Sequence, residues 1–357
     1  MRRKKAGADG TRSAPPVLAR VLRGGRVESV HRGAVAVVDA AGRRVARVGD
    51  DGHRVFIRSA GKPFQALPLL EAGGEKRFRL GDDEIALMCA SHGGEPSHVR
   101  VAARLLARGG FSARDLGCGA QWPMHEGSAQ ALARRGLRPT PLHNNCSGKH
   151  AGLLLACRIY GFSPRGYLEP GHPIQKEVLR RVSDFSGVPA AKIPIGVDGC
   201  GLPVFFLPLA ALARAYAGLV AKERPGESRF AAAVRRRVVR AMTASPAMVA
   251  GRGRFTTDFL RAGGGRWIGK EGAEGVYAVA IAPSEANRGR AAGVALKIED
   301  GSTRARDAVT LAVLDRLGLL PRSARRSLAA HRAPEVRNAR GEVVGSIETE
   351  SFAIAAP

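Results

Sequence analysis

The sequence predicts an α+β protein in which one antiparallel sheet is flanked by helices. Residues 17–57 are rich in β-branched side chains in rough alternation and are interrupted by Gly-Gly, Ala-Gly and Asp-Asp-Gly, a pattern typical of strands joined by tight turns. Residues 63–262 show apolar patterns of helical length, and residues 266–298 return to a strand pattern. Strands at both ends with helices between them favour one sheet closed by the two ends of the chain.

The middle region is expected to be largely helical because several of its apolar segments end at glycine, a common helix terminator. Helices are expected over 82–91, 96–108, 126–135, 148–160, 171–186, 208–221, 228–243 and 255–262, with a further amphipathic helix over 303–317. We divide the chain into a basic disordered tail (1–16), one domain (17–330) and a C-terminal extension (331–357).

The composition indicates a globular protein, since 45% of the 357 residues are hydrophobic, which is enough for a substantial core. The chain has no run of about 18 uncharged apolar residues and begins without the apolar segment of a secretory signal, so we expect a cytoplasmic protein with no membrane partner. Its five cysteines lack disulfide spacing. Cys89, Cys118 and Cys157 lie in or near apolar helical patterns and are expected in the core.

The net charge of +26 raises the possibility of a basic nucleic-acid-binding protein. The distribution of the charge argues against it, because arginines are spread along almost every segment and aromatic residues make up only 5% of the chain. Binders of single strands interleave basic and stacking residues, and no such run is present. Nucleic acid is therefore not an expected partner.

The segment RSAGKPFQALPLL contains Ser59 and Lys62, three positions apart, where a polar turn meets an apolar run. If Ser59 begins a helix, the side chain of Lys62 could reach its hydroxyl and, in its neutral amine form, act as a general base. The alternative is structural: serine is an ordinary helix cap, and Pro63 is an ordinary first-turn residue. Pro68 adds a complication, since it could kink or end the helix one turn later.

Four other segments combine glycines with side chains that transfer protons or bind metals. They are CASHGGEPSHV (89–99), HNNCSGKHAG (143–152), GVDGCGLP (196–203) and KEGAEGVY (270–277). Together with RSAGKPFQ they resemble, in order, the asparaginases of the rhizobial type, also called thermolabile or class 3. The resemblance extends from about residue 17 to about residue 317.

This resemblance implies two serine–lysine pairs and a fold like that of serine β-lactamases and related glutaminases. Ser59 matches the nucleophile and Lys62 its lysine, while the preceding Arg58 helps to hold the substrate. Ser91 matches the second serine and Lys270 the second lysine. The family also suggests a homodimer.

The resemblance further implies a zinc ion bound by Cys146, Lys149 and Cys200. The residues alone give a weaker signal: Cys146 and Lys149 are three positions apart at the start of a helix, but no C-x-x-C pair is present. On that basis alone the two cysteines would be interpreted as core thiols. Imidazoles offer alternative nitrogen ligands, at His92, His143 and His150.

Substrate binding is expected to use both signs of charge, because a small amino acid carries an ammonium and a carboxylate. Arg58 would hold the α-carboxylate and Asp198 the α-ammonium, although an Asp before Gly also commonly caps its own turn. The further residues assigned to substrate binding are His92, Asn144 and His150.

We therefore expect an L-asparagine amidohydrolase that works through an acyl-enzyme formed on Ser59. A glutaminase, or another amide or β-lactam hydrolase with the same serine–lysine site, is the alternative, because one methylene changes selectivity by only about 1–3 kcal/mol. The distant alternative is the nucleic-acid-binding protein considered above.

Overall fold

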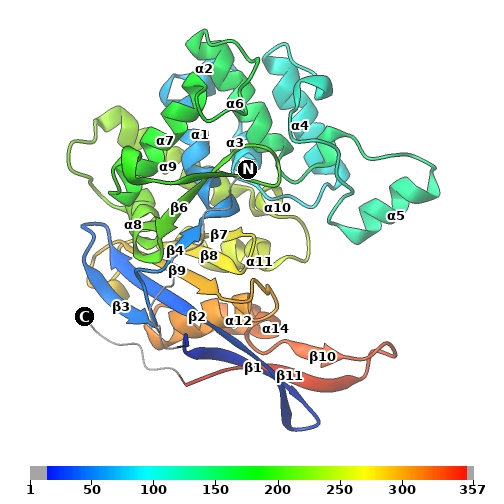
Figure 1. Cartoon of the computed structure of the whole chain (residues 1–357), viewed down its shortest axis with the longest axis vertical. Coiled ribbons are helices and arrows are strands. Elements are labelled where there is room, and N and C mark those ends of the chain that lie inside the picture. Colours follow the sequence, from blue (N-terminus) through cyan, green and yellow to red (C-terminus); the bar gives the residue numbers. More distant parts are fainter. Residues whose placement is uncertain (1–13, 352–357) are drawn as a thin grey trace, which may run out of the picture.

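The two ends of the chain form one eight-stranded antiparallel sheet (Figure 1). The computed structural model describes residues 14–351, so most of the expected tail at 1–16 lies outside the described residues. The strand order is β10-β11-β1-β2-β9-β8-β7, and β3 pairs with the C-terminal half of β2. The bounds are β1 (Val17–Arg23), β2 (Arg26–Asp39), β3 (Arg44–Val48), β7 (Trp267–Gly272), β8 (Val276–Ile281), β9 (Ala292–Ile298), β10 (Glu335–Arg337) and β11 (Val343–Thr349).

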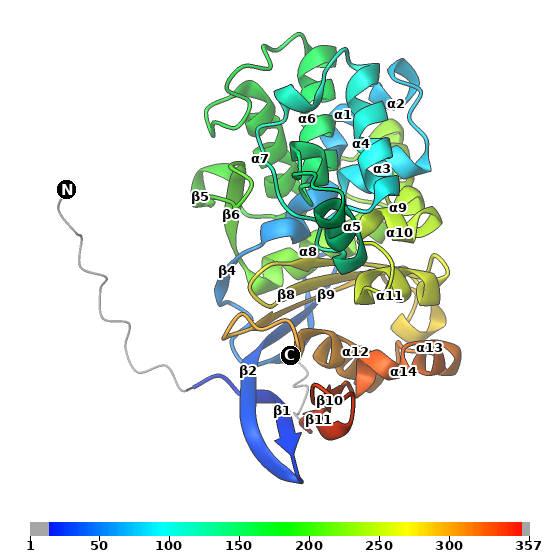
Figure 2. The same ribbon diagram turned by 90° about the vertical axis from the view of Figure 1, so that its right-hand side faces the viewer.

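Helices cover both faces of this sheet, which confirms the predicted α+β class. Figure 2 shows the larger helical layer above the sheet and a smaller one below it. The larger layer and its edge contain α1 (Lys62–Glu71), α2 (Gly74–Arg77), α3 (Asp82–Met88), α4 (Pro96–Arg108), α5 (Glu126–Arg134), α6 (Ser147–Tyr160), α7 (Pro173–Ser186), α8 (Leu209–Val220), α9 (Arg229–Ala244), α10 (Pro246–Val249) and α11 (Phe255–Gly263). The lower layer contains α12 (Arg306–Arg316), α13 (Arg322–Ser327) and α14 (Ala329–Arg332).

The alternation of side chains along the central strands separates two hydrophobic cores. In β2, Ala34 and Ala36 face the core of the larger helical layer, whereas Val35 and Val37 face the core of the smaller one. Small residues let α8 lie close to the sheet. At Gly293 in β9 a Cβ atom would lie 1.8 Å from the carbonyl oxygen of Ala213, so only glycine fits there.

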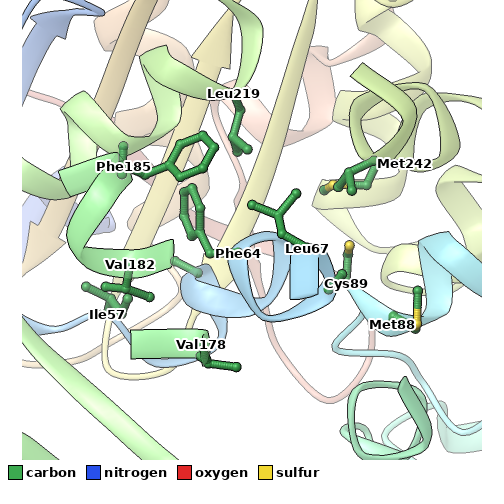
Figure 3. Packing of buried hydrophobic residues seen from close by; sticks show 14 of the residues in the cluster. Ile57, Phe64, Leu67, Met88, Cys89, Val178, Val182, Phe185, Leu219 and Met242 are labelled. Carbon is green, nitrogen blue, oxygen red and sulfur yellow. The ribbon is translucent and has the colours of Figure 1, made fainter. Parts of the chain in front are cut away.

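The helix that follows the Ser59 segment is fixed by core packing (Figure 3). Phe64 of α1 packs against Phe185 at 5.2 Å and Tyr216 at 5.7 Å between ring centroids. Every residue from Lys62 to Leu70 is buried, so the apolar run of this segment is a core helix. Pro68 lies inside α1 and does not end it, since the helix continues to Glu71.

The helical middle region also contains strands that the sequence patterns did not indicate. β6 (Pro203–Pro208) and β5 (Ile195–Val197) join β4 (Arg54–Phe56), which lies in the predicted strand region 17–57, in a separate three-stranded sheet of order β4-β6-β5. The helix expected over 82–91 ends at Met88, and the chain then leaves the helix as a loop that carries Ser91.

The segment assigned as a C-terminal extension from residue 331 contributes two strands to the main sheet. β11 pairs with β1, with Val21 opposite Ile347, and β10 covers the outer edge of β11. Among residues 14–351, no helix is both long enough and apolar enough to cross a membrane.

Candidate active site

The segment Arg58–Gly61 forms a short 3₁₀ helix directly before α1 and contacts β7 and β8 of the main sheet. Gly61 is the N-cap residue of α1, and the Ser59 hydroxyl makes no capping hydrogen bond. The interpretation of Ser59 as a helix cap is therefore wrong. Arg58 has a φ of 48°, a left-handed conformation that costs a residue with a side chain about 1–3 kcal/mol and that clusters at functional sites.

Lys62 points away from solvent into the interior, where its side chain is fully buried. Its ammonium donates to the carbonyl of Ala90, to the Ser91 hydroxyl at 3.1 Å and to the carbonyl of Asn145 at 3.4 Å. Within the described residues its hydroxyl partner is thus Ser91, although Ser59 is the serine nearest in sequence.

Ser91 lies between two lysines that come from different parts of the fold. Lys270 of β7 donates to the Ser91 hydroxyl at 2.8 Å, and Lys62 of α1 donates to the same hydroxyl. The backbone of Ser91 is held by a bond from its N–H to the carbonyl of Val249 at 3.0 Å. The structure therefore brings three of the four predicted catalytic residues into one buried hydrogen-bonded chain.

The environment of Lys270 is arranged to weaken its hold on a proton. Burial lowers the pKa of its ammonium to about 7; the carboxylate of Glu271 opposes this shift, and the positive charges of Lys62 and Arg254 add to it. A lysine with a pKa near 7 exchanges protons readily at neutral pH, which is the property required of a general acid–base group.

Arg58 and Asp198, the two residues expected to bind the charged ends of the substrate, pair with each other at 2.7 Å. Burial would raise the pKa of the Asp198 carboxyl, but Lys149 and Arg58 together hold it below its usual value. Asp198 also accepts the N–H of Gly199 at 2.9 Å, so it caps its own turn as well as pairing with the arginine.

Asn144 and His92 are both tied to the local framework. The amide of Asn144 donates to the carbonyls of Cys118 at 2.9 Å and Gly119 at 3.1 Å, which shapes the loop before α6. His92 Nε2 lies 2.9 Å from the Ser147 hydroxyl. Burial, together with nearby positive groups, holds the pKa of His92 well below its usual value, so the imidazole is neutral at pH 7.

His150 has one partnered and one unpartnered ring nitrogen. Its Nδ1 lies 2.7 Å from the hydroxyl of Tyr167, which itself accepts the N–H of Gly117 at 2.8 Å. When the tyrosine hydroxyl donates to Nδ1, Nε2 carries the hydrogen of the neutral ring. Burial keeps the pKa of His150 well below its usual value, and among residues 14–351 its Nε2 has no hydrogen-bond partner.

Cys146, Lys149 and Cys200 come together at the start of α6. The ammonium of Lys149 lies 3.0 Å from the sulfur of Cys200, and the Cys146 thiol donates to the side-chain amide oxygen of Asn145 at 3.0 Å. The neighbouring Cys200 thiol and the nearby lysines lower the pKa of the Cys146 thiol well below its usual value. Burial opposes the charge on Lys149, yet the two thiols and Asp198 raise the pKa of its ammonium.

These three side chains fit zinc only if Lys149 is a ligand. Two thiolates and an amine form a suitable donor set once the amine has lost its proton. In the part of the chain that the structure describes, no three His, Cys, Asp or Glu side chains are grouped to hold a metal. Cys89, Cys118 and Cys157 are buried in the core as expected.

Four residues at this site carried no separate signal in the sequence. Glu271 and Arg254 surround Lys270, the Asn145 carbonyl accepts from Lys62, and Tyr167 orients His150. Glu271 directly follows Lys270 in the KEGAEG segment, so the sequence shows that the two residues are neighbours but not what Glu271 does. Arg254 and Tyr167 become neighbours of the site only through the fold.

Residues 19–349 match the family model described as L-asparaginase II. The chain belongs to the L-asparaginase II family. The resemblance found in the sequence is thereby confirmed at the level of the family, and membership indicates an amidohydrolase. No curated protein matches the sequence significantly.

Two solved structures illustrate the more distant similarities. Native Mglu in 4.3 M NaCl is 18% identical over 80% of this chain and 60% of that chain, with a TM-score of 0.35. A probable glutaminase from Bacillus subtilis complexed with 6-diazo-5-oxo-L-norleucine is 11% identical over 83% and 87%, with a TM-score of 0.36. The chain spans about 60% of the length of that Mglu structure. TM-scores this low do not establish a shared fold, so the α+β class rests on the strands and helices described above.

Proposed function

We propose that this protein hydrolyses L-asparagine to L-aspartate and ammonia through an acyl-enzyme formed on Ser59. The observation that carries the proposal is the buried chain from Lys62 through the Ser91 hydroxyl to Lys270, which starts one turn beyond Ser59. Membership of the L-asparaginase II family supports the reaction class. Burying two lysines around one hydroxyl carries a desolvation cost that packed apolar side chains would avoid, which favours a functional role for the group.

The proton of the nucleophile travels along this chain in our proposal. Neutral Lys270 takes a proton from Lys62 through Ser91, and the neutral Lys62 then accepts the proton of Ser59 as its oxygen attacks the side-chain amide carbon. When the C–N bond breaks, the same path returns a proton to the leaving nitrogen. Water then attacks the ester, gives up its proton along the chain, and releases aspartate.

Arg58 and Asp198 supply the two charges that an amino-acid substrate requires. We propose that the substrate carboxylate pairs with Arg58 and its ammonium with Asp198, which replaces the ion pair between them at 2.7 Å. The unpartnered Nε2 of His150 is an available donor for the same ligand. We also propose that His92 and Asn144 contribute to substrate binding indirectly, because they hold the surrounding loops in place.

The oxyanion is assigned to the backbone N–H of Ser59, because those of Ala60 and Lys62 already bond to the carbonyls of Ile57 and Ser59. Cys146, Lys149 and Cys200 would hold a zinc ion. When bound, that ion would act as a positive charge that fixes the surrounding loops and the substrate.

We further propose a cytoplasmic homodimer with no nucleic-acid partner. Resemblance to the rhizobial-type enzymes supports the dimer, and the scattered arginines support the absence of a nucleic-acid site. Size-exclusion chromatography with light scattering tests the dimer.

The decisive test compares ammonia release from L-asparagine and L-glutamine by the wild type and by Ser59→Ala. Removal of a serine nucleophile should lower turnover by at least about 100-fold, because the acyl-enzyme cannot form. Ser323→Ala, at an exposed position of α13 far from the site, is the matched control and should keep full activity.

Thermal melting of the variants separates loss of chemistry from loss of fold. A folded Ser59→Ala protein with full activity would refute the mechanism. Full activity on glutamine with none on asparagine would assign the same mechanism to a glutaminase.

A further inference from the structure

Arg254 is placed so that its side chain contacts Ser91 directly and reaches Lys270 through the carboxylate of Glu271. It is the N-cap residue of α11. Its guanidinium donates to the carbonyl of Ser91 at 2.7 Å and to the carboxylate of Glu271 at 3.3 Å. A planar guanidinium with several donors holds two acceptors in a fixed relation, which an ammonium does not do equally well.

Glu271 completes the arrangement from the side of the sheet. Its carboxylate lies 3.1 Å from the Lys270 ammonium and accepts the hydroxyl of Thr256 on its other oxygen. Thr256 in turn lies 3.0 Å from the hydroxyl of Tyr277, opposite Glu271 on β8. Lys270, Arg254 and Thr256 thus anchor the carboxylate of Glu271, a residue that is only 5% exposed.

We propose that Arg254 and Glu271 are a positioning pair that aligns Ser91 with Lys270 and controls how readily Lys270 gives up its proton. The proposal rests on the proposed function, in which Lys270 is the terminal proton acceptor. Neither residue needs to touch the substrate, because each acts through Lys270 and Ser91.

The two members of the pair act on Lys270 in opposite directions. The charged or titratable groups that face Lys270 are Glu271, Arg254, Lys62 of α1 and the Cys89 thiol at the end of α3. The negative charge of Glu271 favours the ammonium form, whereas the positive charge of Arg254 disfavours it. The pKa of Glu271 is held at about 2 despite burial, mainly by Lys270 and Arg254, so its charge is present throughout the working range.

The test uses two neutralising variants and a matched control. Glu271→Gln keeps an acceptor for Thr256 but removes the charge, and Arg254→Gln removes the positive charge while retaining a donor. Arg252→Gln is the control, because Arg252 is two residues away, pairs with a different buried carboxylate (Glu95, 2.7 Å) and keeps its backbone bond to that group. Arg254→Lys restores the charge without the forked geometry.

The titration of Lys270 is read by NMR of protein labelled with ¹³C at lysine Cε, with the signal assigned from Lys270→Met. A charge within a few ångströms moves a pKa by about one unit or more. The Lys270 midpoint should therefore fall in Glu271→Gln and rise in Arg254→Gln by about one pH unit each. It should stay unchanged in Arg252→Gln and return toward the wild-type value in Arg254→Lys. In a plot of kcat/KM against pH, the limb that rises with pH should move in the same direction as the Lys270 midpoint.

Opposite shifts of the NMR midpoint support the proposal, because a merely structural defect would not change sign with the charge removed. No shift in either variant, or shifts in the same direction, would overturn it. A kcat/KM limb that stays fixed while the midpoint moves would also overturn the role in proton transfer. The NMR reading needs no substrate, so inactivity toward asparagine would defeat the proposed function without hiding whether the pair controls Lys270.

Discussion

Lys149 and Lys270 are two equally buried lysines with opposite properties. Their exposed fractions are 3% and 0%, so burial alone does not distinguish them. The thiols of Cys146 and Cys200 raise the pKa of Lys149, whereas burial near Lys62 and Arg254 lowers the pKa of Lys270 to about 7. The neighbouring charges thus decide whether a buried lysine is a fixed cation or a proton acceptor.

The contrast also divides the site by task. The Lys270 region is a closed hydrogen-bonded chain that is suited to moving protons. The Lys149 region adjoins Asp198, and through it Arg58, where the substrate charges are expected to bind. Substitutions in the two regions should therefore affect different kinetic constants.

The largest effect is expected from Lys270→Met. Loss of the terminal proton acceptor should lower kcat by about 10²–10⁴, the usual contribution of a general acid–base group. Lys270→Arg should be equally impaired, because a guanidinium stays protonated at any working pH. Steady-state kinetics at saturating asparagine measures this, with circular dichroism as the check on folding. A variant within a few-fold of the wild type would show that Lys270 does not take part.

Lys149→Met is expected to act on zinc and on substrate binding more than on kcat. Removal of the third donor should lower zinc affinity by at least about tenfold, as measured by isothermal titration calorimetry. KM should rise because the loop that carries Asp198 loses the lysine that adjoins it. Wild-type protein treated with a chelator should behave similarly and retain turnover at saturating asparagine. Complete loss of turnover on chelation would instead indicate that a metal-bound hydroxide attacks the amide.

The fold class was predictable because its signals are local and extensive. Strand alternation persists over residues 17–57 and 266–298, and the helical patterns between them are long. The three-residue strand β5 was missed because so short a segment has no measurable period. The strands at 335–337 and 343–349 were missed because their role depends on pairing with β1 at the far end of the chain.

The candidate site was only partly predictable for a related reason. Reactive residues cluster with glycine in short segments, so the participants were visible in the sequence. Their pairing was not, since Lys62 bonds to a serine 29 positions away and Arg254 reaches Ser91 across 163 positions. Spacing favours the nearest partner in the chain, whereas packing of α1 against the core selects the nearest partner in space.

The smallest expected effect concerns stability and follows from the Lys270 pKa of about 7, which lies below the usual value of 10.5. Between these two values the unfolded chain binds a proton that the folded protein does not, so this residue makes the free energy of unfolding increase with pH. From pH 7 to pH 9 the gain is on the order of 2 kcal/mol relative to Lys270→Met, which lacks the titrating group. Urea unfolding of both proteins at a series of pH values measures the difference, and shared effects of other groups cancel. A difference that stays constant from pH 7 to pH 9 would mean that Lys270 keeps its proton in the folded protein, and the contrast with Lys149 would disappear.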